Sequence, residues 1–119
     1  MRTVEKPWGH ETIWAETENY TAKELHINAG HRLSLQYHEK KDETVRVVQG
    51  TLYLHHRLES DLLGDGPLQV DELSVGDCYR VLPGRLHRFE ARDEDVVLCE
   101  VSTSELDDVV RVEDDYERN

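Results

Sequence analysis

Residues 30–50 read GHRLSLQYHEKKDETVRVVQG and contain two runs of strand length, 32–38 and 43–49, joined by the polar residues 39–42. A glycine stands at each end of the stretch, and glycine commonly marks the corners between short strands. The stretch therefore predicts two strands, with a sharp corner before the first and another after the second.

The same punctuation continues along the chain, where Gly or Pro recurs at short intervals and no repeat, linker or low-complexity tract appears. Further β-type runs lie at residues 20–28, 51–58, 81–82, 86–91 and 96–101. Only residues 104–110 look helical, because they follow a serine that can cap a helix. A length of 119 residues suits one domain. We expect a single all-β domain over residues 1–119, an antiparallel sandwich of the jelly-roll type with little helix.

The composition excludes several classes of partner. The chain has 26 acidic and 14 basic residues and a formal charge of −12, which argues against binding to nucleic acid or to an anionic membrane. No apolar run approaches the roughly 18 residues of a membrane span, and the first residues lack the apolar stretch of a signal peptide, so we expect a cytoplasmic protein. Cys78 and Cys99 suit neither a zinc knuckle nor a CxxC pair, and we expect buried, reduced thiols.

A possible metal site arises from the two strands of the opening stretch. Gln36 and His38 are two residues apart, so they point to the same face of a strand and can converge on one point. Glu43 can meet them from the next strand, and His87, behind the turn at residues 83–86, is a candidate fourth member. Two imidazoles, a carboxylate and an amide oxygen suit zinc, iron, manganese or nickel. A closed structural zinc site is not expected, because sulfur ligands are absent from the set.

At this point the residues resemble a known family. Residues 30–50 resemble the first cupin motif, and residues 76–90, GDCYRVLPGRLHRFE, resemble the second with its PGxxH intact. The resemblance implies the cupin double-stranded β-helix. Gln36 stands where cupins often place a histidine, and together with the preceding LSL it is similar to the cupin domain of type II phosphomannose (mannose-6-phosphate) isomerases. The likeness extends to KPWG at residues 6–9 and to the acidic tail, where Glu117 replaces a glycine that is common in the family.

The resemblance implies a metal-dependent isomerase that interconverts an aldose and a ketose, such as mannose 6-phosphate and fructose 6-phosphate. Its cofactor would be a divalent ion, with zinc expected first, held by Gln36, His38, Glu43 and His87. Lys23 is a candidate catalytic residue that holds a phosphate or moves a proton, and Arg111 is a candidate that places the sugar or stabilises negative charge. The competing interpretations are a solvated strand residue for Lys23 and a surface salt bridge for Arg111. The sequence does not identify the catalytic base.

Two other functions stay open at the level of the sequence. The first is a cupin that binds a small carbohydrate or carboxylate through the same metal without converting it, which the lack of a transferase domain among these residues and the altered tail would suit. The second is an iron-dependent cupin oxygenase, for which a glutamine ligand is less suitable. Because exposed sheet edges invite pairing, we also expect a homodimer.

Several other conspicuous residues receive no role in this interpretation. For Trp8 and Trp14, packing in the core is favoured over stacking on a sugar ring. The acidic run at residues 105–117 is expected to be a solvated face. The remaining histidines have no matching spacing and are expected at the surface or in hydrogen bonds; they are His10, His26, His31, His55 and His56.

Overall fold

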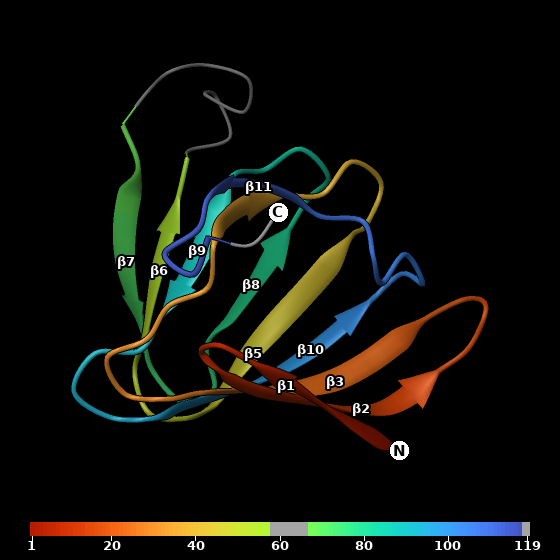
Figure 1. Ribbon diagram of the computed structural model, residues 1–119, viewed down its shortest axis with the longest axis horizontal. Coiled ribbons are helices and arrows are strands. Elements are labelled where there is room, and N and C mark those ends of the chain that lie inside the picture. Colours follow the sequence, from red (N-terminus) through yellow and green to blue (C-terminus); the bar gives the residue numbers. More distant parts are fainter. Residues whose placement is uncertain (58–66, 118–119) are drawn as a thin grey trace.

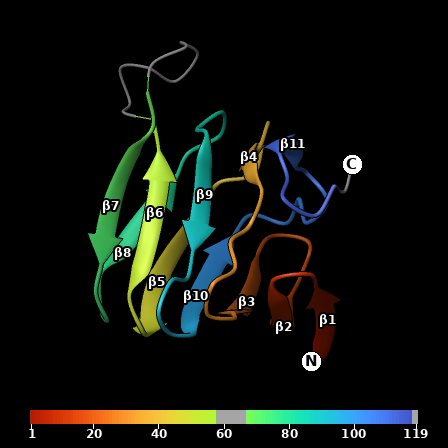
Figure 2. The same cartoon turned by 60° about the vertical axis from the view of Figure 1, so that its left-hand side comes forward.

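The computed structural model describes residues 1–57 and 67–117, which form two antiparallel β-sheets (Figure 1). The strands are β1 (Arg2–Lys6), β2 (Gly9–Glu16), β3 (Thr21–Ile27), β4 (Leu35–Tyr37), β5 (Glu43–Gln49), β6 (Leu52–His56), β7 (Gln69–Leu73), β8 (Cys78–Val81), β9 (His87–Glu90), β10 (Val96–Ser102) and β11 (Val110–Glu113). One sheet has the order β1-β2-β3-β10-β5-β8, and the other has the order β11-β4-β9-β6-β7. Figure 2 shows the two sheets as separate layers. The predicted all-β sandwich is confirmed.

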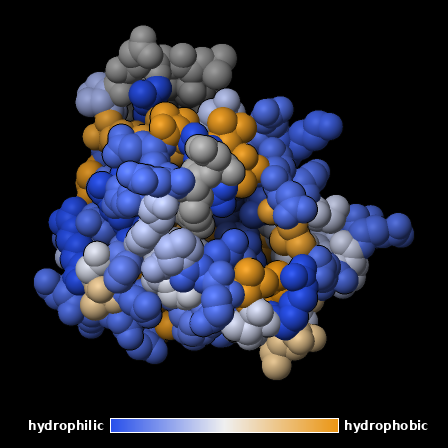
Figure 3. All heavy atoms as spheres, in the orientation of Figure 1, coloured by the Kyte–Doolittle hydropathy of each residue, from blue (hydrophilic) through white to orange (hydrophobic). Residues whose placement is uncertain are grey.

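The core fills the space between the two sheets and follows from strand alternation. On β3, Leu25 and Ile27 are both almost completely buried, while the residue between them is only partly covered. Leu52 and Leu54 of β6 and Phe89 of β9 are buried from the opposite sheet. Trp8 belongs to the same cluster, as favoured from the sequence, whereas Trp14 is 52% exposed. The exposed apolar residues form small, separate patches on the face that Figure 3 shows.

The predicted strands at residues 20–28, 32–38, 43–49 and 86–91 contain observed strands, and the run at 96–101 matches all of β10 except its last residue. The run at 81–82 overlaps β8 only at Val81, and the helix at residues 104–110 is wrong. This segment forms tight turns, in which the amide of Leu106 donates to the carbonyl of Ser104 and that of Val109 to the carbonyl of Asp107. The turns free the Asp108 carboxylate to accept hydrogen bonds from three successive backbone amides at residues 39–41. A long-range contact thus replaces the local helix.

Other predictions also need correction. Strands β1, β2, β7 and β11 were not predicted, and the run at residues 51–58 ends as a strand at His56, with Leu58 outside the described residues. The thiols are free, but Cys78 is exposed and Cys99 is only half-buried. Both cysteines pair with Arg46 of β5, one from each neighbouring strand, and their side chains point to the outer face of the sheet, away from the core.

Two expectations about partners depend on this architecture. No helix that could cross a membrane occurs in residues 1–57 and 67–117. The sheets end at β1 and β8 in one layer and at β11 and β7 in the other. These are the edges through which pairing would occur, and the homodimer stays a prediction.

Candidate functional site

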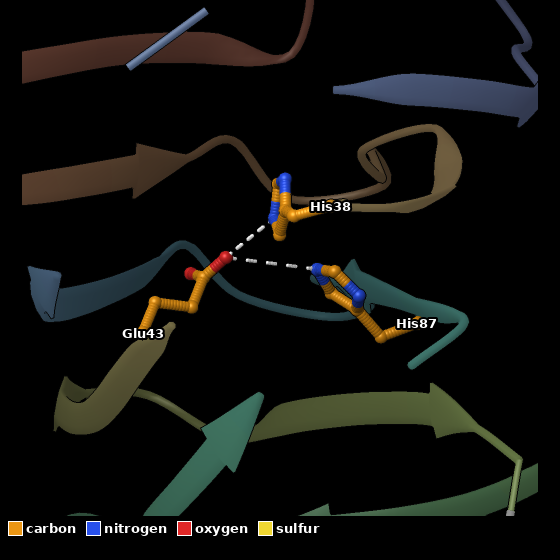
Figure 4. A group of neighbouring side chains, drawn as sticks. All are labelled: His38, Glu43 and His87. Atoms are coloured by element: carbon orange, nitrogen blue, oxygen red, sulfur yellow. Dashed lines mark ion pairs between the residues drawn. The ribbon is translucent and has the colours of Figure 1, made fainter. Parts of the chain in front are cut away.

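Three side chains from separate elements converge at one end of the sandwich (Figure 4). His38 follows β4, Glu43 is the first residue of β5, and His87 is the first residue of β9. Nε2 of His38 lies 2.6 Å from Oε1 of Glu43, and Nε2 of His87 lies 4.0 Å from the same oxygen. One donor atom from each residue falls within 4.8 Å of the other two. The structure therefore brings together three of the four predicted metal ligands.

The hydrogen bonds behind the two imidazole rings define which nitrogen is available. Nδ1 of His38 is 2.5 Å from the carbonyl oxygen of Asp108, and Nδ1 of His87 is 3.0 Å from that of Arg85. A carbonyl oxygen can only accept, so Nδ1 carries the hydrogen in each ring. Burial lowers the pKa of His87 to about 3, which keeps this ring neutral at physiological pH. Both Nε2 atoms thus face Glu43, and in a neutral ring each offers the lone pair that metal binding requires.

The remaining polar atoms of the cluster lack hydrogen-bond partners. Nε2 of His38, Nε2 of His87 and Oε2 of Glu43 are all buried and make no hydrogen bond within the described residues. Leaving a buried donor or acceptor unpaired is costly, and an imidazole lone pair 2.6 Å from a carboxylate oxygen is repulsive unless a proton or cation lies between them. A divalent ion would satisfy all three atoms at once, so these residues can hold a metal.

Pairing between strands explains why residues so far apart in sequence meet here. Gln36 of β4 pairs with His87 of β9, and the amide of Gly84 donates to the carbonyl of His38 at 2.6 Å. Gly84 has a φ of +83°, a conformation that favours glycine, so the Pro83–Gly84 turn can fold back onto the loop after β4. Backbone contacts therefore join the two motifs independently of the metal-site side chains.

A pocket of about 190 Å³ opens beside His38 and Gln36, between the two sheets. Its lining includes basic side chains from four parts of the chain. These are Arg2 and Lys6 of β1, Lys23 of β3, Lys41 of the loop before β5, and Arg111 of β11. The acidic side chains of the lining are Glu11 and Asp107. Five of the 14 basic residues of an acidic chain thus surround one pocket, which favours an anionic ligand.

A row of buried charges of alternating sign connects this pocket with the three convergent side chains. Lys23 lies 3.1 Å from Glu11 and 3.7 Å from Glu100, and Lys41 lies 3.2 Å from Glu100 and 3.9 Å from Glu43. All five residues are less than a tenth exposed. Buried charges persist only when they are paired, and each lysine here lies between two carboxyl groups.

The row contains two carboxyl groups, Glu43 and Glu100, that share a hydrogen bond. Burial and the charge of Glu43 raise the pKa of Glu100, so Glu100 takes the proton of the pair. Burial also opposes ionisation of Glu43, but contacts with His38, Glu100 and Lys41 outweigh it and lower the pKa of Glu43. Glu43 therefore remains a carboxylate, the form that binds metal. Burial opposes the charge on Lys41 as well, yet Glu100 and Glu43 raise its pKa, so this lysine stays protonated.

The predicted catalytic residues both reach the pocket. Lys23 is buried rather than solvated, and Arg111 lines the pocket with a buried Nε that has no hydrogen-bond partner among the described residues. Gln36 also lines the pocket, and its Oε1 accepts a hydrogen bond from Ser34 at 2.6 Å. Its other lone pair is left for a ligand.

Sequence reasoning missed Glu11, Lys41 and Glu100. Glu100 lies two residues after the core residue Leu98 on β10, so both side chains point to the same inner face, and this spacing could have predicted the burial of Glu100. The same signal was not available for Glu11, because β2 had not been recognised. Lys41 belongs to a polar loop and gave no sign of burial.

Most of the remaining histidines and part of the acidic tail take part in specific contacts. Four of the unassigned histidines are hydrogen-bonded as expected, with Glu24, Tyr116, Glu90 and Asp71 as partners of His26, His31, His55 and His56. The acidic run at residues 105–117 is not simply a solvated face. Its Asp108 holds three backbone amides, and its Asp115 binds Arg32 at 2.6 Å. These contacts fix the segment that carries Arg111.

Two antiparallel sheets with a histidine and carboxylate cluster define the class of protein, a cupin. The family model described as mannose-6-phosphate isomerase C-terminal matches residues 1–114. The chain belongs to this family. It is also 34% identical over 119 residues to mannose-1-phosphate guanylyltransferase ManC of Salmonella typhimurium, a match that covers 98% of this chain and 23% of that protein. The chain thus spans about a quarter of the length of this curated relative.

Solved structures agree on the fold. A sugar phosphate isomerase of the cupin superfamily from Silicibacter pomeroyi has a TM-score of 0.58 at 25% identity, over 71% of this chain and 50% of that chain. KdgF from Halomonas sp. has a TM-score of 0.73 at 20% identity, over 90% and 91% of the two chains. CapF from Staphylococcus aureus reaches 0.80 at 18% identity, over 94% and 32%. The last two similarities concern the fold alone.

Proposed function

We propose that this protein is a metal-dependent isomerase that interconverts an aldose phosphate and its ketose, with mannose 6-phosphate and fructose 6-phosphate as the first pair to test. The observation that carries the proposal is the position of His38, Glu43 and His87, whose candidate metal-binding atoms include three without a hydrogen-bond partner, beside a pocket with five basic side chains. The family of the chain and the sugar phosphate isomerase among its structural neighbours support the same reaction.

The four proposed ligands are His38, His87, Glu43 and Gln36. A divalent ion held by them would withdraw electron density from the oxygens on C1 and C2 of the sugar and so acidify the proton on C2. Zinc is proposed first, because two imidazoles and a carboxylate form a set that zinc commonly takes; manganese, iron and nickel also accept these donors.

The side chains around the pocket supply binding and charge stabilisation. We assign Arg2, Lys6 and Arg111 to the phosphate and sugar oxygens, because they line the pocket and carry the positive charge that an anionic ligand requires. Lys41, whose pKa is raised, stays cationic and offsets negative charge that develops on the sugar oxygens.

The test combines metal analysis with an activity assay. Protein purified without chelator is analysed for bound metal, and the metal-loaded protein is incubated with a panel of aldose phosphates and the matching unphosphorylated aldoses. We expect about one equivalent of a divalent ion and conversion of a phosphorylated sugar only. Absence of conversion across the panel, with full metal content, would refute the isomerase.

A second candidate is a cupin that binds the same ligand without converting it. The relative ManC is described as a mannose-1-phosphate guanylyltransferase and not as an isomerase, which suits a domain that binds a sugar phosphate without isomerising it. Binding of a sugar phosphate, measured by calorimetry, without exchange of its C2 hydrogen in D₂O would favour this candidate over the isomerase.

A further inference from the structure

The inner face of β2 and β3 carries an ion pair that opens into the pocket. Nζ of Lys23 lies 3.1 Å from Oε1 of Glu11, and the two side chains are only 8% and 12% exposed. Both line the pocket together with His38 and Gln36. The register places Lys23 opposite Ile13 and Leu25 opposite Glu11, so Glu11 and Lys23 are diagonal neighbours on one face of the sheet.

We propose that Glu11 is the catalytic base that carries the proton between C2 and C1 of the sugar, and that Lys23 is a positioning residue that holds this carboxylate in place beside the pocket. The inference rests on the proposed isomerase function and identifies the group that the sequence left open.

The positions and contacts of the other acidic groups near the pocket make each of them less suitable as the base than Glu11. Glu43 faces both imidazoles of the metal cluster, so it is occupied as a ligand. Glu100 is buried behind Lys23 and Lys41 and does not line the pocket. Asp107 is an exposed turn residue. Among the described lining residues, Glu11 is the buried carboxylate outside the metal cluster.

The lysines are unsuitable as bases. Nζ of Lys41 lies 3.2 Å from Glu100 and 3.9 Å from Glu43, and Nζ of Lys23 lies 3.1 Å from Glu11 and 3.7 Å from Glu100. Each lysine nitrogen is thus engaged by two carboxyl groups. Glu11 lines the pocket, and a carboxylate offers the lone pairs that accept a proton.

The proton transfer balances without an oxidant or reductant. The Glu11 carboxylate removes the hydrogen from C2, the C2–H electrons form a C1=C2 double bond, and the aldehyde oxygen gains negative charge. Glu11 then returns the proton to C1, the hydroxyl proton on O2 moves to O1, and the C2–O2 bond becomes the ketone. One group serves both carbons, because they are adjacent and present the same face to it.

The decisive variant is Glu11→Gln, which preserves size and removes the base. The matched control is Glu24→Gln, on the neighbouring strand β3 but on the outer face of the sheet, where it contacts His26. We expect Glu11→Gln to lower kcat by about 100-fold or more, the usual contribution of general base catalysis. It should also abolish deuterium incorporation at C2 of the aldose in D₂O, while metal content and calorimetric binding of mannitol 1-phosphate, which has no carbonyl, stay close to wild type. Glu24→Gln should match wild type in all four measurements.

Two outcomes separate the failure of this inference from the failure of the isomerase. If wild type converts a sugar phosphate and metal-loaded Glu11→Gln keeps more than about a third of its kcat, another group is the base and the isomerase stands. If wild type converts none, both fall. Should Glu11→Gln not fold, Glu11→Ala with added formate decides the matter, because a small carboxylate in the vacated space restores turnover only if a base was lost. Failure of formate to raise turnover in a folded Glu11→Ala protein overturns the assignment.

The role of Lys23 needs a readout that simple loss of packing would not move. Glu11 is faced by the cations Lys23 on β3, Lys41 before β5, and Arg2 and Lys6 on β1. Lys23→Met removes the 3.1 Å contact with Glu11 and should lower kcat while metal content and binding of mannitol 1-phosphate stay close to wild type, and Lys23→Arg, which keeps a cation beside Glu11, should restore kcat. An unchanged kcat in Lys23→Met, or no recovery in a folded Lys23→Arg, would refute the positioning role.

Discussion

At the scale of single residues, the cluster of His38, Glu43 and His87 is organised by the backbone before any ion is bound. Carbonyls of Asp108 and Arg85 fix the two rings, and the Gly84 amide fixes the loop that carries His38. The rings are therefore held in one tautomer with Nε2 facing Glu43. A site with little left to rearrange binds metal without a large loss of side-chain entropy.

This arrangement predicts the effect of removing either ring. His38→Ala and His87→Ala should each weaken metal binding by more than about 100-fold, the upper range for loss of even an indirect partner of a ligand. The fold should persist, because the core cluster contains neither ring. Metal per chain is measured after dialysis, with circular dichroism alongside. The control is His10→Ala on the outer face of β2, and retention of full metal in both site variants would contradict the proposed ligand set.

Sequence alone could predict residues of this site only where their spacing within a motif determines their position in the fold. His38 and His87 stand at fixed positions next to strand ends and a Pro83–Gly84 turn, so spacing was sufficient to group them with Glu43. The position of Lys41 depends instead on Asp108, a residue 67 positions away whose carboxylate binds the Lys41 amide. No local pattern encodes such a contact. The base proposed here, Glu11, was inaccessible for a related reason, since its direction depends on a strand that the sequence did not reveal.

At the scale of elements, strands that contribute to the core were easier to predict than those that do not. β3, β5 and β10 have regular apolar alternation and were predicted. β1 and β11 bury little apolar surface and owe their extended shape to their neighbours, β2 and β4. These weak strands nevertheless supply the pocket with Arg2, Lys6 and Arg111. The segments that are hardest to predict are those that shape the binding surface.

The last element of the fold, β11 with its flanking turns, predicts a pH-dependent contribution to stability. Asp115 accepts from Nε and Nη2 of Arg32 at 2.6 and 3.1 Å and lies 3.5 Å from Arg88. The hydrogen bond with Arg32 lowers the pKa of Asp115. A lowered folded pKa means that the stabilisation is present above the unfolded value of about 3.9 and is lost as pH falls through the folded pKa.

Asp115→Asn tests this contribution. Because the pair is partly exposed, the variant should lose only about 1 kcal/mol at pH 7, and the difference from wild type should shrink towards zero as pH falls below the unfolded pKa of about 3.9 and through the lowered pKa of the folded protein. Thermal unfolding at a series of pH values measures it. Asp93→Asn, in the exposed turn between β9 and β10, is the control and should follow wild type throughout. A difference that stays the same from pH 7 down through the folded pKa would exclude the ionised pair as its source.

At the scale of the whole molecule, the charge is distributed unevenly. The chain carries a net charge of −12, yet five of its 14 basic residues line the proposed substrate pocket. The rest of the surface is therefore even more acidic than the total suggests. Repulsion among these acids opposes folding, while the basic pocket favours an anionic ligand, such as the proposed sugar phosphate, against the negative field of its surroundings.

The uneven distribution predicts opposite effects of salt on stability and on substrate affinity. At about 10 mM salt the Debye length of roughly 30 Å is comparable with the molecule, which measures 39 × 35 × 30 Å, so acidic groups repel across its full width. At 1 M the length is about 3 Å, and this repulsion is screened. The melting temperature should therefore rise as KCl increases from 10 mM to 1 M.

Over the same range of KCl the KM for a sugar phosphate should also rise, because screening weakens its attraction to Arg2, Lys6 and Arg111. The kcat should change little, because it is measured with the site saturated. Calorimetric melting and steady-state kinetics on one preparation measure both quantities. A melting temperature that stays flat would show that acidic repulsion does not limit the fold, and a KM independent of salt would show that the pocket does not recognise charge.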